Sequence, residues 1–346
     1  MIHLQRPSPG KPGEGFIQRV NRFGPQHFLA TRSVTHSPKH RSKRSSPFHR
    51  NMPSTRGRIG KNSIFKEIPM RTAFACLLLA SSAFAAEMKV QRDLPYAKTD
   101  NERQTLDVYA PANGKNCPIV FWIHGGGWQN GDKSEVDKKP LAFVEKGFVF
   151  VSTNYRLLPE ATIKQMAMDV AKGIQWIHDH AKEYGGDPNT ILVIGHSAGA
   201  QLAALVCTDD RYLKAEGLSL KVIKGCIPVD GGTYDVPMQI ANVDERTAGI
   251  FRDKFGDEKS QKHLSAVTHV SEGRGIPPFL ILYVADSPRT SGQSERLAKV
   301  LQDAGISARA YPAEGKDHRS LNTELGLPDN KPTKAVFEFL DRVLKK

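Results

Sequence analysis

The sequence predicts an α/β fold, with a mostly parallel central sheet and helices on both faces of that sheet. Short apolar runs alternate with segments in which apolar residues recur at helical spacing, the pattern of consecutive strand–helix–strand units. Several of the runs contain almost no polar residue, as expected of strands covered on both sides. In such sheets the reacting groups gather at the C-terminal ends of the strands. The residues that follow each apolar run are therefore the first candidates for a functional site.

The expected strands and helices alternate from residue 104 to the end of the chain. The strands are expected at 104–110, 117–123, 147–152, 191–194, 222–229, 278–284 and 306–311. The helices are expected at 138–146, 162–183, 200–206, 295–304 and 334–344. Segment 231–275 breaks this alternation, because it is long and polar, with weak helical signals near 243–255 and 260–267. We expect it to be a lid or a substrate-shaping insertion.

The most specific motif is Gly195-His-Ser-Ala-Gly199, which stands between an apolar run and a helical segment. This is G-x-S-x-G in a strand–turn–helix context, where a sharp turn raises the serine at the end of its strand. The two glycines allow neighbouring backbone to pack closely, and the helix N-terminus favours negative charge that develops near Ser197. The plainer alternative is a turn in which Ser197 only caps the helix. Motif and context together predict a serine nucleophile.

A serine hydroxyl is a weak nucleophile and requires a base, which an acid in turn holds in place. His318, in the loop after the last strand, is the expected base, and Asp286, at the end of the preceding strand, is the expected acid. Insertion 231–275 would then precede the acid-bearing strand. The alternatives for these two residues are an ordinary loop histidine and a helix N-cap before 295–304. Asp317 is adjacent to the base in sequence and therefore poorly placed to reach its ring.

The run His124-Gly-Gly-Gly-Trp128 directly follows another buried strand. Glycine lets backbone N–H groups approach a substrate oxygen, so Gly126 and Gly127 are expected to form an oxyanion hole together with Ala198. A flexible glycine loop is the alternative, but the position after a strand and about 70 residues before the nucleophile motif argues against it. His124 is expected to orient this loop rather than to carry protons.

These motifs resemble those of α/β-hydrolase esterases with an HGGGW loop, the hormone-sensitive-lipase-like and BD-FAE-like group that includes relatives of kynurenine formamidase. The resemblance spans about 104–344 and rests on His-Gly-Gly-Gly-Trp at 124–128, Asn-Tyr-Arg-Leu-Leu-Pro at 154–159, the motif at 195–199, Asp286 and His318. It implies an α/β-hydrolase fold and a carboxylic-ester hydrolase that works through an acyl-enzyme. Two features depart from the pattern. Ser-Pro-Arg follows Asp286 in place of an apolar helix start, and 231–275 matches no pattern.

The expected function is hydrolysis of a carboxylic ester by a triad of Ser197, His318 and Asp286. The alternatives among hydrolases are an arylformamidase, like relatives of kynurenine formamidase, and a carbohydrate acetyl or feruloyl esterase. A non-catalytic binding protein with the same fold is less favoured. This chemistry requires neither a cofactor nor a metal ion. The expected partner is a small-molecule or carbohydrate-linked ester.

The formal charge of +13 suggests a nucleic-acid partner until the charge is located along the chain. Residues 1–69 hold 14 Lys and Arg against 2 Asp and Glu, whereas 87–346 hold 34 of each kind. The body of the protein is thus not expected to bind a polyanion. Residues 1–69 are expected to be a disordered basic extension. They are a nucleic-acid or membrane-surface tail, a transit-like leader, or a stretch that is not translated; we favour the last, because of the segment that follows.

Residues 70–86 have the three parts of a signal peptide. Met70-Arg71 supplies a positive start, 72–80 an apolar stretch, and 81–86 a pattern of small residues suited to cleavage. The apolar stretch is too short to span a bilayer. We therefore expect translation from Met70, a mature catalytic domain at 87–346, and a secreted or periplasmic location without stable membrane insertion.

Four cysteines are present, and Cys76 would be lost with the leader. The remaining Cys117, Cys207 and Cys226 are widely spaced and form no C-x-x-C pair, which argues against a zinc site or a disulfide framework. One bridge among them would suit an exported protein, but buried free thiols are favoured.

Overall fold

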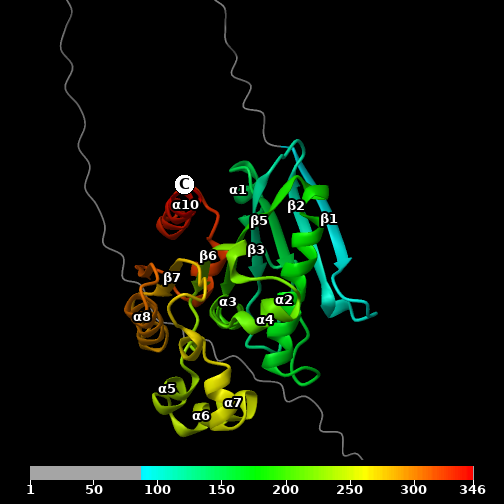
Figure 1. Ribbon diagram of the computed structural model, residues 1–346. Helices are drawn as coiled ribbons and strands as arrows, with labels where there is room; N and C mark the ends of the chain where they lie inside the picture. Colours follow the sequence, from blue (N-terminus) through cyan, green and yellow to red (C-terminus); the bar gives the residue numbers. More distant parts are fainter. Residues whose placement is uncertain (1–86, 346) are drawn as a thin grey trace, which may run out of the picture. The chain divides into compact units, whose positions relative to one another are not determined.

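The computed structural model describes residues 87–345, whose elements form one eight-stranded sheet with helices around it (Figure 1). The strands follow one another across the sheet in the order β1-β2-β4-β3-β5-β6-β7-β8. Their bounds are β1 (Met88–Pro95), β2 (Thr105–Pro111), β3 (Cys117–Ile123), β4 (Val149–Thr153), β5 (Gly186–His196), β6 (Ile223–Val229), β7 (Phe279–Val284) and β8 (Ala308–Ala313). Strands β3 to β8 are parallel to one another. At one edge, β2 runs antiparallel to both of its neighbours, β1 and β4. The expectation of a mostly parallel sheet is confirmed.

Helices cover both faces of the sheet. They are α1 (Lys139–Glu145), α2 (Ile163–His180), α3 (Ala198–Thr208), α4 (Asp210–Ala215), α5 (Val236–Ala241), α6 (Glu245–Phe255), α7 (Glu258–His263), α8 (Pro288–Asp303), α9 (His318–Thr323) and α10 (Lys331–Leu344). On one face α2, α3 and α8 pack over residues such as Phe121 and Ile123 of β3. On the other face α1 and α10 pack over Val120 and Trp122 of the same strand. Both faces of β3 are buried, which explains its unbroken apolar run.

Most helix starts carry local signals. The Thr162 hydroxyl oxygen accepts a hydrogen bond from the Gln165 N–H, and the side-chain oxygen of Gln165 accepts one from the Thr162 N–H, a capping box that begins α2. Helix α8 begins at Pro288, seven residues before the expected start at 295. Its first turns are polar although Thr290, Gln293 and Ser294 are buried there, and proline at the first position suits a helix start. The apolar pattern that marked this helix belongs to its second half only.

One strand and three α-helices were not expected from the sequence: β1, α4, α5 and α9. Strand β1 pairs on one side only and most of its residues are exposed, so it carries no apolar pattern. Helices α4, α5 and α9 each have only six residues, too few for a helical period to show. Insertion 231–275 contains α5, α6, α7 and a 3-10 turn at Ala266–His269, drawn in yellow tones in Figure 1.

The strand register aligns the C-terminal ends of three neighbouring strands. Ile123 of β3 pairs with Gly195 of β5, and His196 of β5 pairs with Val229 of β6. The residues that follow these strands therefore emerge at one edge of the sheet. The functional residues predicted from the sequence are expected at this edge.

Three further observations concern the described residues as a group. No helix of 87–345 is both long and apolar enough to cross a membrane, and no cluster of three or more His, Cys, Asp or Glu in this range could hold a metal ion. Cys117, Cys207 and Cys226 are buried and free, as favoured from the sequence. The expectations for 1–69, for 70–86 and for Cys76 lie outside the described residues.

Candidate active site

Ser197 lies in the turn between β5 and α3 with φ 56° and ψ −115°, a backbone conformation that residues with a side chain rarely adopt. The flanking glycines allow the turn to form. A Cβ on Gly195 would lie 2.2 Å from the carbonyl oxygen of Gly199, and a Cβ on Gly199 would lie 2.2 Å from that of Ile123. The Ser197 side chain makes no capping hydrogen bond to α3. The strained turn is present as predicted, and the capping alternative does not hold.

His318 is the first residue of α9, just beyond β8, and its ring reaches the serine. Its Nε2 lies 3.0 Å from the Oγ of Ser197. A neutral imidazole with its proton on Nδ1 accepts a hydrogen bond from the serine hydroxyl at this distance. The structure thus brings together the two residues predicted as nucleophile and base, although they are far apart in the chain.

The carboxylate that contacts His318 is Asp230, and the assignment of this role to Asp286 is contradicted. The Oδ2 of Asp230 lies 2.6 Å from the Nδ1 of His318, and its Oδ1 accepts a hydrogen bond of 3.0 Å from the Val284 N–H. The Asp286 side chain is exposed and makes no hydrogen bond or ion pair within 87–345. It does not cap α8 either, since Ser287 holds that position. Asp317 caps α9 instead of approaching the ring of His318.

The order of the strands explains this correction. Strand β6 lies between β5 and β7, so the residue after β6 is one strand away from Ser197, whereas Asp286 is two strands away. Asp230 follows β6 directly and has a φ of 52°. Insertion 231–275 consequently follows the acid-bearing strand rather than preceding it. A signal was available in the sequence, because Asp230 is a charged residue placed directly after a buried strand and before two glycines.

Asp230 is held in its charged form. Burial would raise its pKa, since only 1% of the side chain is exposed, but the hydrogen bonds from His318 and the Val284 N–H outweigh burial and lower the pKa below its usual value. An ionised Asp230 keeps a proton on the Nδ1 of His318. The Nε2 of the ring is then free to take a proton from Ser197.

A second histidine supports the first. The Nε2–H of His196 donates a hydrogen bond of 3.0 Å to the backbone carbonyl of His318, and the centres of the two rings are 4.5 Å apart. Burial, followed by the charge of His318, lowers the pKa of His196 to about 3. His196 is therefore neutral under ordinary conditions and serves to position His318. The sequence indicated nothing about this contact, which joins the end of β5 to the start of α9.

The glycine loop after β3 lies against the nucleophile. A Cβ on Gly125 would be 3.1 Å from the Cβ of Ser197, and one on Gly126, whose φ is 112°, would be 2.1 Å from the carbonyl oxygen of Asn130. The N–H groups of Gly126, Gly127 and Ala198 have no acceptor among residues 87–345. The loop therefore offers the free donors and the close approach that an oxyanion hole requires.

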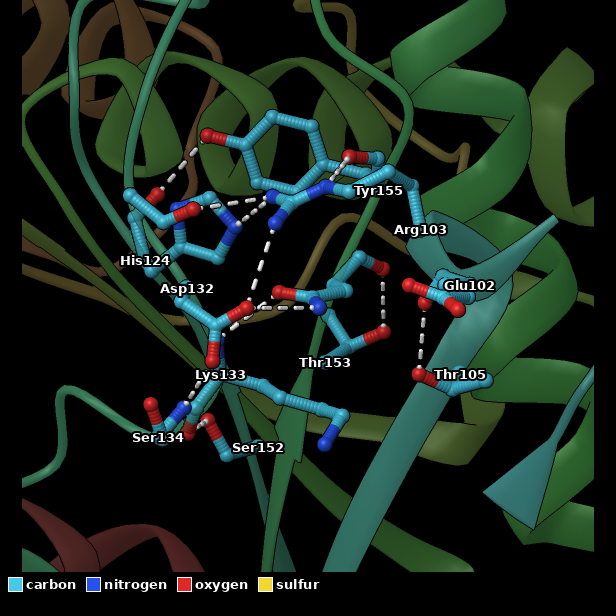
Figure 2. Close-up of polar contacts among 12 residues, drawn as sticks. Glu102, Arg103, Thr105, His124, Asp132, Lys133, Ser134, Ser152, Thr153 and Tyr155 are labelled. Carbon is cyan, nitrogen blue, oxygen red and sulfur yellow. Dashed lines mark hydrogen bonds and ion pairs between the residues drawn. The ribbon is translucent and has the colours of Figure 1, made fainter. Parts of the chain in front are cut away.

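Figure 2 shows the network behind this loop. The guanidinium of Arg103 donates a hydrogen bond of 3.1 Å to the Nε2 of His124, so the proton of this ring is on Nδ1, which donates to the carbonyl of Gly125 at 2.7 Å. Tyr155 stacks on the ring of His124 and donates to its carbonyl oxygen at 2.9 Å. Burial lowers the pKa of His124 to about 4. His124 thus orients the loop, as expected. The part played by Arg103, which also pairs with Asp132, was missed.

The insertion also contacts the glycine loop. Trp128 donates to the side chain of Gln201 at 3.3 Å, and Gln201 donates to the carbonyl of Leu264 at 2.9 Å. The ring of Phe255 meets that of Trp128 edge-on at 5.1 Å. The Nζ of Lys254 donates to the carbonyl of Gly127 at 3.0 Å. Loop, helix α3 and insertion therefore form one connected wall of the site.

A parallel sheet with a strained serine turn, a histidine after the last strand and a glycine loop after β3 defines the α/β-hydrolase fold. Residues 106–301 match the sequence profile of the BD-FAE family. The chain belongs to the BD-FAE family, and the resemblance found in the sequence is confirmed.

Several characterised proteins are similar to this chain. Isoprenylcysteine alpha-carbonyl methylesterase of Arabidopsis thaliana is 28% identical over 271 residues, which cover 72% of this chain and 62% of that protein. Esterase LipQ of Mycobacterium tuberculosis is 28% identical over 261 residues, covering 72% of this chain and 61% of that protein. The chain thus spans about three fifths of the length of these two relatives. Kynurenine formamidase of Danio rerio is 28% identical, covering 72% of this chain and 82% of that protein.

Solved structures agree with the fold. The butyrate-bound structure of an esterase from Thermogutta terrifontis has a TM-score of 0.58 and 25% identity, and covers 75% of this chain and 93% of that one. A carbohydrate esterase from gut microbiota, solved in truncated form, has a TM-score of 0.62 at 21% identity, covering 76% of this chain and 99% of that one. The second likeness supports the fold alone.

Proposed function

We propose that the protein is a serine esterase that hydrolyses carboxylic esters through an acyl-enzyme intermediate. The observation that carries this proposal is the continuous contact from Ser197 Oγ to His318 Nε2 at 3.0 Å and from His318 Nδ1 to Asp230 Oδ2 at 2.6 Å. This is the nucleophile, base and acid arrangement of acyl-transfer enzymes. The similarity to a methylesterase and to other esterases supports the same class.

In the first half of the reaction, Ser197 Oγ attacks the carbonyl carbon of the ester while the Nε2 of His318 takes the hydroxyl proton. Asp230 stabilises the imidazolium that results. The negative charge on the former carbonyl oxygen is bound by the N–H groups of Gly126, Gly127 and Ala198. Collapse of this intermediate releases the alcohol, which takes the proton from His318, and leaves the acyl group on Ser197.

In the second half, water attacks the acyl carbon and His318 accepts a proton from the water. The same N–H groups bind the second oxyanion, and Ser197 leaves with the proton that His318 returns. The products are a carboxylic acid and the free enzyme. In both halves the Nε2 of His318 first accepts a proton and then returns it, while Nδ1 keeps its hydrogen bond to Asp230.

Hydrolysis of a short-chain para-nitrophenyl ester by the chain from Glu87 tests this proposal. Ser197→Ala is expected to lower kcat/KM by about 10⁴-fold or more. Intact-mass detection of an acyl adduct, present in the wild type and absent from Ser197→Ala, checks the intermediate. Full activity of Ser197→Ala would refute the assignment. Failure of a fluorophosphonate probe to label the wild type would instead favour a non-catalytic binding protein.

Hydrolysis of an arylformamide is the second candidate function. The observation that favours it is the similarity to kynurenine formamidase, of whose length this chain covers 82%, more than it covers of the methylesterase. The same triad can cleave a formamide, with an amine in place of the alcohol as leaving group. Rates on formyl-kynurenine, acetylated xylan and a simple acetate ester, compared under one condition, separate the formamidase, the carbohydrate esterase and the general esterase.

We also propose that the protein is exported, with residues 70–86 as a signal peptide and Met70 as the start of translation. The proposal rests on the positive start, the apolar stretch and the small residues of that segment. N-terminal sequencing of natively expressed protein should begin near Ala86 or Glu87. Recovery of 1–69 on the mature protein would contradict it.

A further inference from the structure

A cavity of about 960 Å³ lies beside the glycine loop, between insertion 231–275 and the start of α2. Its volume is in the range of small-molecule sites. Ser197, Asp230 and His318 do not line it. Two of its lining residues, Lys254 and Phe255, contact the loop that carries the proposed oxyanion donors, through Gly127 and Trp128. The cavity therefore lies next to the glycine loop of the candidate active site.

The charge of this cavity is mainly positive. Five Lys and Arg side chains line it against Asp253 and Asp257, and Asp257 is engaged in capping α7. Arg211 is neutralised by a bidentate contact with Asp209, at 2.7 Å from each nitrogen. Arg274 lies 3.4 Å from Asp210. The other three cations, Lys164, Lys254 and Lys259, form no ion pair within residues 87–345.

Among the cations that line the cavity, Lys254 contacts the glycine loop. Its Nζ donates to the carbonyl of Gly127 and lies 5.5 Å from the centre of the Trp128 ring. Burial lowers its pKa, because the ammonium is partly removed from water without a carboxylate to compensate it. An ammonium has three N–H donors, and one acceptor leaves two of them for a ligand. A group that supplies a negative charge at this point would relieve an unfavourable burial.

His263 also lines the cavity, and its pKa is lowered mainly by burial and then by the charge of Arg211. The apolar part of the wall is supplied by Ile163, Phe255 and Leu264. The cavity thus combines an apolar surface with uncompensated cations, which suits an organic acid better than a neutral or cationic molecule.

We propose that the cavity binds a carboxylate carried by the ester substrate, with Lys254 as the residue that selects it. This inference rests on the proposed esterase function. The carboxylate belongs to the part of the ester that does not react, and its apolar body packs on Phe255 and its neighbours. Lys254 determines specificity, and it also holds the Gly127 carbonyl.

Two pairs of esters that differ only in this charge test the proposal. One pair, para-acetoxybenzoate and para-acetoxybenzamide, carries the difference on the alcohol side. The other, monomethyl terephthalate and methyl para-carbamoylbenzoate, carries it on the acyl side. Each kcat/KM is divided by the rate of hydroxide-catalysed hydrolysis of the same ester. We expect the anionic member to be preferred by about tenfold in at least one pair, mainly through KM, and the preference to fall in about 1 M sodium chloride.

Variants of Lys254 separate its proposed role in substrate selection from its contact with the Gly127 carbonyl. Lys254→Met is expected to reduce the anionic preference to about twofold or less, and Lys254→Arg to retain it. Any loss of loop support in Lys254→Met lowers both members of a pair equally and cancels in the ratio. Lys262→Met, in α7 and paired with Glu258, is the control and should leave the ratio unchanged.

Three results overturn the proposal. The wild type hydrolyses neutral esters without a preference in either pair, or the preference survives in Lys254→Met, or Lys262→Met removes it equally. In each case esterase activity is present and only the substrate class fails. If neither member of either pair is hydrolysed and Ser197 takes no acyl group, the esterase proposal itself fails, and the substrate class with it.

Discussion

The choice between Asp230 and Asp286 as the acid yields the sharpest prediction. Asp230→Asn replaces the carboxylate by an amide of the same shape. The Val284 N–H donates to Oδ1 at 3.0 Å, so the amide oxygen is required there, and the NH₂ group must face the Nδ1 of His318. A donor at that position forces the ring proton onto Nε2, where it faces Ser197. The base can then no longer accept the hydroxyl proton.

The size of the effect follows from this change of tautomer. Loss of the correct tautomer and of the charge that stabilises the imidazolium lowers kcat by about 10³- to 10⁴-fold, or about 4–5.5 kcal/mol of transition-state stabilisation. Asp286→Asn alters an exposed side chain without a hydrogen bond within 87–345, so its kcat should stay within about threefold of the wild type.

The assay is hydrolysis of a para-nitrophenyl ester by the two variants and the wild type, with the fraction of active enzyme titrated by a fluorophosphonate. Circular dichroism and thermal unfolding show whether Asp230→Asn, whose site is buried, keeps its fold. If Asp286→Asn loses about 10³-fold in kcat while Asp230→Asn stays near the wild type, the geometric argument is refuted.

Three further predictions concern the loop and the buried charges. Gly126→Ala places a Cβ 2.1 Å from a backbone oxygen at a φ of 112°, so the loop must move, and kcat should fall by about 100-fold or more in the same assay; an unchanged kcat would exclude an oxyanion role. Lys139 is fully buried, and burial lowers its pKa to about 8, so Lys139→Met should raise the free energy of unfolding in denaturant by about 1–3 kcal/mol, and a decrease would contradict this. The pKa values of His124 and His196 are lowered from 6.5 to about 4 and about 3. Between about pH 6.5 and about pH 4 the unfolded chain gains these protons and the folded chain does not. The free energy of unfolding therefore decreases as the pH is lowered through this range, by up to about 1.4 kcal/mol per pH unit for each ring. His196→Gln should remove one such contribution from the slope measured by urea unfolding between about pH 6 and about pH 4, and an unchanged slope would count against its burial as a neutral ring.

The nucleophile and the base could be predicted because their signals are local. Ser197 lies in a turn that requires glycine at two positions. A side chain at Gly195 would clash with the backbone of Gly199, and one at Gly199 would clash with the end of β3. Both glycines belong to the motif that predicted the nucleophile. His318 follows the last strand, and among the histidines of residues 87–345 it is the one placed at that strand end. The fold class could be predicted for the same reason, since buried parallel strands carry unbroken apolar runs.

The acid could not be chosen from local signals. Asp230 and Asp286 both follow a fully buried strand, and the choice depends on which strand lies next to β5 in the sheet. That order is a property of the tertiary fold. Arg103 was missed for a similar reason. Its contact with His124 joins two side chains that are far apart in the sequence, and such a contact produces no pattern of apolar residues. Strand β1 was missed because an exposed edge strand lacks the apolar alternation that identifies buried strands.

The attachment of Asp230 to β7 has a consequence for how this protein can diversify. The Asp230 N–H donates to the carbonyl of Leu282 at 2.8 Å, and its carboxylate accepts a hydrogen bond from the Val284 N–H. Both partners lie in β7 and outside insertion 231–275, so the sheet itself holds the acid in place. Lengthening insertion 231–275 changes its chain entropy only slowly with length. New substrate ranges can therefore arise by changes in the insertion that keep its contacts with Gly127, Trp128 and Gln201, while the proton relay stays in place.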